Sequence, residues 1–296
     1  MDRRTAGSLF VVVSALGAST LTIVAKMAYQ VGLTLSSILA FRFLIATVLV
    51  WALLALDRAN RERTGAERLR FGLGTRSLVA ALALGGVVFS GMSGLYFAGL
   101  TELSAATAIV VFYTAPVFVL VFSAAFLDER VTRKTVTAAA TALAGVVLIA
   151  GANPAGVSLG GVALVLAAAV GYAVYTTLGR ATLERVDSRV LTGYVMPATA
   201  AVFVAYGAVT GSLTAPATLR GWAVVAALAV VGTVVPVFAY FEGLKRIGAS
   251  RAGVLTTLEP LLTVAMGVAV LGEPLSPATV AGGALVLTGA ILVQRS

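Results

Sequence analysis

The 296-residue chain contains no cysteine and no histidine. It therefore has no thiolate or imidazole ligands for a metal, no cysteine nucleophile and no Ser-His-Asp triad, and it forms no disulfides. It also lacks the Gly-x-x-x-x-Gly-Lys-Ser/Thr loop that binds nucleotide phosphates, which argues against ATP-driven transport within the chain. We expect no enzyme activity, no metal and no cofactor.

Charged residues are scarce as well. They make up 11% of the chain, against roughly 25% in a soluble domain, while 59% of the residues are hydrophobic and the mean hydropathy is +1.02. The apolar residues form runs of about 20, the length of a helix that crosses a bilayer. The sequence predicts an all-α polytopic membrane protein with ten transmembrane helices, near residues 7–28, 36–56, 77–98, 104–127, 134–151, 159–179, 189–210, 221–241, 251–271 and 277–294.

The few charges are placed unevenly, within a net charge of +9. If the N-terminus is inside, every Lys and Arg except Lys26, Arg42 and Arg220 falls in or beside an inner loop. This is the positive-inside bias of membrane proteins. It predicts an integral protein of the bacterial inner (plasma) membrane with both termini cytoplasmic, and it explains the basic balance without a nucleic-acid partner. The basic loop at 57–76 is also suited to contact anionic membrane lipid.

The chain contains an internal repeat. Tyr96–Ile149 falls without a gap on Tyr240–Val293 at an offset of 144 residues, and the first span matches the sixth at an offset of 154. The first span is therefore expected to be a retained helix and not a cleaved signal peptide. Because each half holds five spans, the second half enters the membrane in the opposite sense. We predict two inverted five-helix repeats, 1–153 and 154–296, a device of secondary transporters.

The repeated residues resemble a known family. The residues concerned are Tyr96-Phe97-Ala98-Gly99-Leu100, Ser104-Ala105-Ala106-Thr107-Ala108, Tyr113-Thr114-Ala115-Pro116-Val117-Phe118, Leu258-Glu259-Pro260, Leu271-Gly272-Glu273 and Arg42-Phe43. In these segments the chain resembles the EamA-type transporters of the drug/metabolite transporter superfamily, and in general character its amino-acid and metabolite exporters, including the YddG-like ones. The resemblance implies an exporter with a central cavity lined mostly by the first, third, fourth, sixth, eighth and ninth helices.

Glu259 is the most informative ionisable residue, because a carboxylate at membrane depth is costly and usually faces a cavity. It stands before Pro260, with Thr256 three residues earlier on the same helical face. Its repeat equivalent is Ala115, so it does not belong to the shared scaffold. Two interpretations stay open: a ligand for a substrate amine or a protonatable coupling group, and a structural carboxylate beside a proline break.

Lys26 and Arg42 lie toward the outer ends of the first and second spans. Lys26 shares a helical face with Ser19 and Thr22. Its side chain either binds a substrate carboxylate or extends to the membrane interface, and we favour the extension. Arg42 is favoured as a partner that sets the outer gate or the helix end, ahead of a substrate contact. Both are gating candidates.

Pro116 and Pro260 are equivalent prolines in the middle of the fourth and ninth spans. A proline removes a backbone hydrogen bond and kinks a helix. We interpret the pair as hinges that let each helix bend between inward-open and outward-open forms, with a static kink as the alternative.

Tyrosines and hydroxyl residues recur in the spans expected to face the cavity. Tyr172, Tyr175 and Thr176 share one helical face. Such a cavity suits an amphipathic organic solute, although interfacial or packing roles fit some of these tyrosines. The candidate substrate-binding residues are Ser19, Thr22, Tyr96, Tyr113, Thr114, Tyr172, Tyr175, Thr176, Tyr240, Thr256 and Glu259.

Together these features predict a secondary transporter that exports small organic metabolites, amino acids above all, by alternating access. One alternative is a drug or cation exporter that exchanges substrate for protons at Glu259. An alternative of another class is a lipid translocase or a membrane scaffold. The expected partners are a small-molecule substrate and membrane lipid, and we expect a monomer, with a dimer as the alternative.

Overall fold

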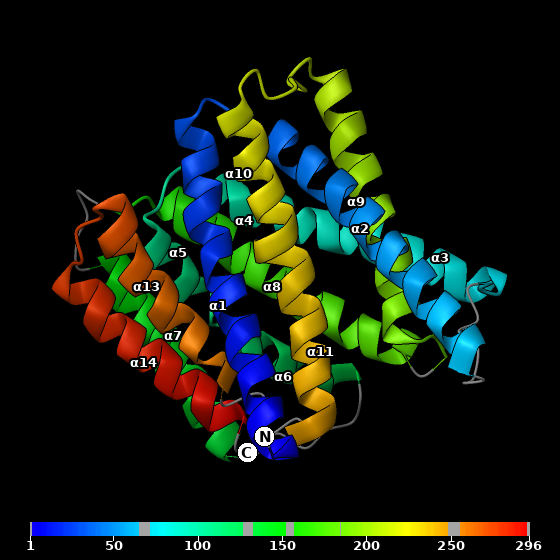
Figure 1. Cartoon of the computed structure of the whole chain (residues 1–296). Helices are drawn as coiled ribbons and strands as arrows, with labels where there is room; N and C mark the ends of the chain where they lie inside the picture. The colour runs from blue at the N-terminus through cyan, green and yellow to red at the C-terminus, as the bar shows by residue number, and fades with distance from the viewer. Residues whose placement is uncertain are drawn as a thin grey trace.

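The computed structural model describes residues 2–64, 72–126, 133–151, 157–183, 185–247 and 255–294, and within them it is helical without strands. Long helices alternate with shorter ones, and some successive segments continue one another as a single span, such as α3, η1 and α4 (Figure 1). Their bounds are α1 Arg3–Gln30, α2 Leu35–Thr64, α3 Thr75–Ala83, η1 Leu84–Phe89, α4 Ser90–Gly99, α5 Ala105–Phe112, α6 Ala115–Phe126, α7 Arg133–Gly151, α8 Leu159–Leu183, α9 Ser188–Val209, α10 Leu219–Ala229, η2 Val230–Val234, α11 Val235–Ile247, α13 Leu258–Leu271 and α14 Pro277–Gln294.

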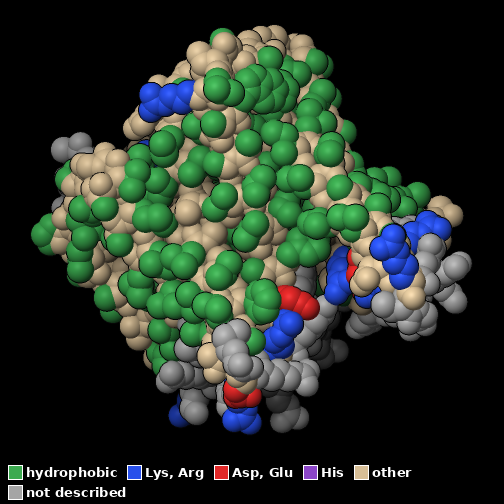
Figure 2. Space-filling view, viewed as in Figure 1, with side chains coloured by type: hydrophobic (Ala, Val, Ile, Leu, Met, Phe, Trp, Pro, Cys, Tyr) green, Lys and Arg blue, Asp and Glu red, His purple; other side chains and the backbone are tan. Residues whose placement is uncertain are grey.

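The helices are those of a membrane protein. In the described part of the chain, six are long and apolar enough to cross a bilayer, and four more are shorter and apolar. Hydrophobic side chains cover most of the outer surface in Figure 2, and charged ones gather mainly at its lower end. A soluble protein would keep such an apolar surface away from water. The predicted class, an all-α integral membrane protein, is confirmed.

Both termini lie at the same end of the molecule (Figure 1). We call this the terminal end and the opposite one the far end. α1 rises from the terminal end, so Lys26 near its C-terminus lies toward the far end.

The two halves pack in corresponding ways. α1 packs against α11 and α13 of the second half, and α8 packs against α4 and α6 of the first. The pairs α2–α9 and α7–α14 also join the halves, and the α7–α14 contact is extensive. The contacts of α1 in the first half thus correspond to those of α8 in the second half. Because they all join one half to the other, the core lies between the halves.

Two π-helical segments, η1 and η2, occupy similar places in the third and eighth predicted spans. Each segment accepts a hydrogen bond from a helix of the other half. Arg42 Nε of α2 donates to Thr233 Oγ1 in η2 at 2.9 Å, and Thr199 Oγ1 of α9 donates to the Gly85 carbonyl in η1 at 2.9 Å. Thr233 Oγ1 also bonds the Leu228 carbonyl five residues back. A π-helical turn leaves backbone groups that need such partners, and these turns are frequent at functional sites.

The α7–α14 contact depends on glycine. A Cβ at Gly145 would lie 2.5 Å from the Gly282 carbonyl oxygen and 2.9 Å from Val286. Gly145→Ala should therefore destabilise the protein by about 1–3 kcal/mol, the usual cost of overpacking a tight interface. Thermal unfolding in detergent measures this. Gly91→Ala is the matched control, because no atom lies within 4 Å of its Cβ position, and an equal loss in both variants would contradict the packing argument.

Candidate functional site

The fourth and ninth predicted spans are interrupted near their middles. Tyr113 and Thr114 form a turn between α5 and α6, and Thr257 forms a turn just before α13. Pro116 and Pro260 follow directly, each in the first turn of the next helix. A proline is tolerated there because its missing N–H would have no intrahelical partner. The predicted kinks are thus breaks in the helix, and their role as hinges stays a prediction.

The two breaks meet through Tyr113 and Glu259. The Tyr113 hydroxyl donates to Glu259 Oε2 and to the Thr256 carbonyl oxygen, each at 3.0 Å. Glu259 lies in the first turn of α13, where the helix dipole favours a negative charge. The equivalent position in the first half, Ala115, is buried and has no polar side chain. This contact links the first half to a carboxylate of the second half that has no counterpart in the repeat.

Aromatic residues surround this contact. Tyr96 and Tyr172 lie within electrostatic range of Glu259. The Phe112 ring lies between them, with its centroid 5.0 Å from that of Tyr96 and 5.7 Å from that of Tyr172, both edge to face. We call Tyr96, Tyr113, Tyr172 and Glu259 the tyrosine–glutamate cluster. Its members come from α4, α8, α13 and the α5–α6 break, so it lies between the halves.

The cluster is anchored at one edge and accessible at another. Tyr96 is 6% exposed, and its hydroxyl is 2.8 Å from Thr22 Oγ1 of α1. Tyr172 is 37% exposed, although it belongs to a helix packed on α4 and α6. Tyr240 lies within electrostatic range of Tyr172. The tyrosines therefore extend from a buried wall to an open surface.

Other candidates are placed differently. Ser19, Thr22 and Thr114 are at most 1% exposed. Ser19 donates to the Leu16 carbonyl, Thr114 to the Val111 carbonyl and Thr176 to the Tyr172 carbonyl, so these hydroxyls satisfy their own helices. Tyr175 packs against Phe89 with ring centroids 5.1 Å apart. Thr256 lies at the break and offers its backbone carbonyl.

Arg42 is buried, with 5% exposure. Besides its bond to Thr233, its guanidinium lies 4.7 Å from the Phe43 ring centroid and 5.3 Å from that of Phe97. These are cation–π distances. The side chain is thus held by Phe43 of α2, Phe97 of α4 and Thr233 of η2.

Lys26 contacts a carboxylate at the far end. Its Nζ lies 3.7 Å from Glu273 Oε1. Both Glu273 oxygens accept from the Ala105 backbone N–H, at 3.0 and 2.8 Å, so this side chain also caps α5. We call Lys26, Glu273 and Ala105 the far-end latch. It joins α1, the loop after α13 and the start of α5.

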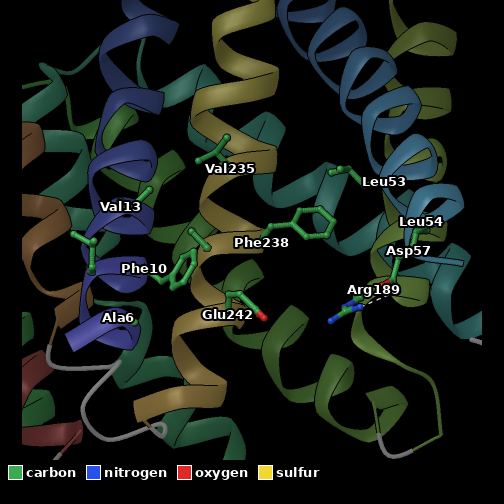
Figure 3. Close-up of a pocket in the computed structure, with 12 residues that line it drawn as sticks. Ala6, Phe10, Val13, Leu53, Leu54, Asp57, Arg189, Val235, Phe238 and Glu242 are labelled. Carbon is green, nitrogen blue, oxygen red and sulfur yellow. Dashed lines mark hydrogen bonds and ion pairs between the residues drawn. The ribbon is translucent and has the colours of Figure 1, made fainter. Parts of the chain in front are cut away.

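A cleft of about 580 Å³ lies toward the terminal end, between α1 and α11 on one side and α2 and α9 on the other (Figure 3). Phe238 extends across it toward Leu53. Its residues are Ala6, Leu9, Phe10, Val13, Leu53, Leu54, Asp57, Arg189, Val235, Phe238, Ala239 and Glu242.

The rim of the cleft carries charges that the sequence alone did not single out. Arg189 Nη1 is 2.8 Å from Asp57 Oδ2, and Arg61 Nε is 3.0 Å from the same oxygen. Glu242 faces them from the other wall (Figure 3). These residues stand at span ends, where charges ordinarily mark the membrane interface, so only their meeting in space identifies them.

Within the residues that the structure describes, no group of three or more Asp or Glu side chains is placed to hold a metal ion. A polar cluster between two packed halves of an apolar helical protein is typical of a membrane transporter, because such groups at membrane depth commonly mark a solute pathway. The chain belongs to the EamA-like transporter family, whose pattern matches residues 5–151 and again 159–295. The predicted family and the transporter class are confirmed.

Relatives point the same way. An uncharacterized transporter of Archaeoglobus fulgidus is 34% identical over 210 residues, 67% of this chain and 70% of its own length. The uncharacterized transporter YcbK of Bacillus subtilis is 28% identical over 94% of this chain and 89% of its own. The threonine/homoserine exporter RhtA of Escherichia coli is 29% identical over 72% and 75%. One crystal structure superposes with a TM-score of 0.62 at 25% identity, over 98% of this chain and 96% of that one.

Proposed function

We propose that this protein is a secondary transporter that exports small organic metabolites, amino acids above all, by alternating access. The observation that carries the proposal is the hydrogen bond from Tyr113 to Glu259, which places a carboxylate and a tyrosine hydroxyl between the two halves. The likeness to a protein named a threonine/homoserine exporter supports the substrate class. We place the protein in the bacterial inner membrane as a monomer with both termini cytoplasmic.

The proposed architecture is ten transmembrane helices in two inverted repeats, 1–153 and 154–296. Three observations support it: the exchangeable packing of α1 and α8, the paired segments η1 and η2, and the paired breaks before Pro116 and Pro260. An inverted pair can adopt two related packings, one open to each side. The cleft at the terminal end and the latch at the far end fit the form that is open to the cytoplasm.

Reconstituted proteoliposomes test the function. Purified protein should move labelled amino acids down an imposed gradient, and protein-free vesicles should not. Glu259→Gln should reduce the rate at least about tenfold and flatten its dependence on pH, because an amide neither holds a substrate amine as an ion pair nor takes up a proton. Tyr113→Phe should reduce it less, since it removes a hydrogen bond and keeps the charge.

The matched control is Tyr206→Phe, which removes a tyrosine hydroxyl from a side chain that is 54% exposed and outside the cluster. It should transport like the wild type. Equal rates for Glu259→Gln and the wild type would remove Glu259 from the mechanism, and a protein that moves no solute under any gradient would rule out transport.

A second candidate function rests on the same carboxylate. A buried acid hydrogen-bonded by a tyrosine also suits an exporter of drugs or organic cations that exchanges them for protons at Glu259. Proton countertransport, measured as acidification or alkalinisation with each candidate substrate, separates the two. The alternative function of another class is a lipid translocase or a membrane scaffold. Scrambling of labelled lipid without movement of any solute would favour the translocase.

A further inference from the structure

The tyrosine–glutamate cluster contains one ionisable carboxylate, Glu259. Lys26 and Arg42, the cations that the sequence places toward the outer ends of the first two spans, are engaged in other contacts. Lys26 pairs with Glu273 in the far-end latch. Arg42 is buried against η2 and two phenylalanine rings. Among the side chains that the structure describes, an amino acid in this site therefore meets a negative charge for its ammonium group, while Lys26 and Arg42 are already held by other groups.

One face of the Glu259 carboxylate is taken and the other is available. Oε2 accepts the Tyr113 hydroxyl. Within the part of the chain that the structure describes, Oε1 accepts no hydrogen bond. It is also not one of the fully buried side-chain atoms without a partner, so this oxygen is accessible. An ammonium group donates up to three hydrogen bonds and pairs well with such an oxygen.

Aromatic rings lie around this carboxylate. Tyr96 and Tyr172 lie within electrostatic range of Glu259, with Phe112 between them. The face of an aromatic ring attracts a cation and offers nothing to a carboxylate. A carboxylate that enters the site finds neutral hydroxyls as its donors, and these pair less strongly with an ion than a charged donor does.

We infer that this site selects its substrate by the ammonium group, and that the substrate carboxylate contributes little to selection. The inference rests on the proposed function and sharpens its substrate class. The site takes organic ammonium compounds: amino acids, but equally their amides, esters and the corresponding amines. A compound whose amine has been acylated is excluded even when its carboxylate and side chain are intact.

Three derivatives of each amino acid test the inference directly. For threonine, leucine and phenylalanine, the free amino acid, the amide and the N-acetyl derivative are each added to the purified protein, and affinity is obtained from thermal stabilisation against concentration. The amide keeps the ammonium and lacks the carboxylate charge, and the N-acetyl derivative is the reverse. Removing one partner of a buried charged pair weakens binding at least about 30-fold.

The expected result is that amides bind within a few-fold of the free amino acids, and that N-acetyl derivatives bind at least about 30-fold more weakly. Glu259→Gln should abolish the difference. The matched control Glu102→Gln neutralises a carboxylate in the exposed loop between α4 and α5 and should preserve it. Correct folding of both variants is checked by their elution as single species in detergent.

The inference is overturned if an N-acetyl derivative binds as well as its amide, or if neither free amino acids nor amides bind at all. Its failure differs from that of the proposed function. Proteoliposomes that export amino acids while the protein binds N-acetyl derivatives keep the exporter and lose ammonium selection. Amide binding with no movement of amino acids keeps the ammonium site and rejects an amino-acid exporter.

Discussion

A double variant carrying Leu53→Cys and Phe238→Cys should lose at least about tenfold of its transport rate on oxidation and recover it on reduction. The two residues lie on opposite walls of the cleft at the terminal end, on α2 and α11, and Phe238 extends toward Leu53 (Figure 3). Alternating access requires this cleft to close when the far end opens. A disulfide needs Cα atoms within about 7 Å, so it forms in the closed cleft and then holds it closed.

The chain suits this experiment because it contains no cysteine of its own. Cross-linking is followed by the shift of the band on a non-reducing gel, and transport is measured on the same vesicles. Each single variant under the same oxidant is the control and should retain its rate. A double variant that cross-links fully and still transports would mean that the cleft is not on the substrate path. One that transports without ever cross-linking would mean that its walls do not meet.

Closure of the cleft, which the proposed alternating access requires, would give its charged rim a role. Glu242 and Arg189 face each other across the opening, and Arg189 already pairs with Asp57. An approach of the walls would bring Glu242 to a guanidinium that one carboxylate does not fully use, since guanidinium carries five donors. In the proposed alternation these opposite charges would favour the closed form, in competition with the ion pair that Glu242 Oε2 makes with Arg246 Nη1 at 3.3 Å.

Much of the fold follows from the sequence, because membranes restrict it. The apolar runs predict helices, and α1 runs from Arg3 to Gln30 against a predicted 7–28. The second span was predicted too short, because α2 continues to Thr64 and makes the first part of the predicted loop at 57–76 helical. The π-helical segments were not predicted. They depend on partners such as Arg42 and Thr199 from distant spans, and no local pattern records such partners.

The site was predictable in part. Glu259 was found because a carboxylate is costly at membrane depth, and its position beside a break is as expected. Its pairing with Tyr113 was not, since the two are 146 residues apart and meet only through the packing of α5 near α13. Lys26 shows the same limit: its sequence context favoured an extension to the interface, and the structure gives it Glu273 as a partner. The sequence around a loop carboxylate does not indicate which distant lysine it will contact in the fold.

The far-end latch is the counterpart of the cleft, and its geometry begins at Gly272. This residue ends α13 with φ of +65°, a conformation that glycine adopts without strain. The chain then turns, and the Glu273 carboxylate reaches both Lys26 and the N–H of Ala105. Glu273 thus has two roles, an ion pair and a helix cap, and substitutions can separate them.

Glu273→Ala should open the far end most, because it removes both roles: it leaves the Ala105 N–H and Lys26 without their carboxylate, at a cost of about 1–3 kcal/mol. Glu273→Gln keeps an acceptor for the Ala105 N–H and loses the ion pair. Lys26→Met also loses only the ion pair, worth about 0.2–1 kcal/mol at a partly exposed site. Maleimide labelling of Leu103→Cys, a residue 4% exposed beside the latch, reports opening. The expected order of labelling rates is Glu273→Ala, then Glu273→Gln with Lys26→Met, then the unsubstituted latch. If Lys26→Met labels as fast as Glu273→Ala, the ion pair holds the far end and the cap does not. If all four label alike, this contact does not close the far end.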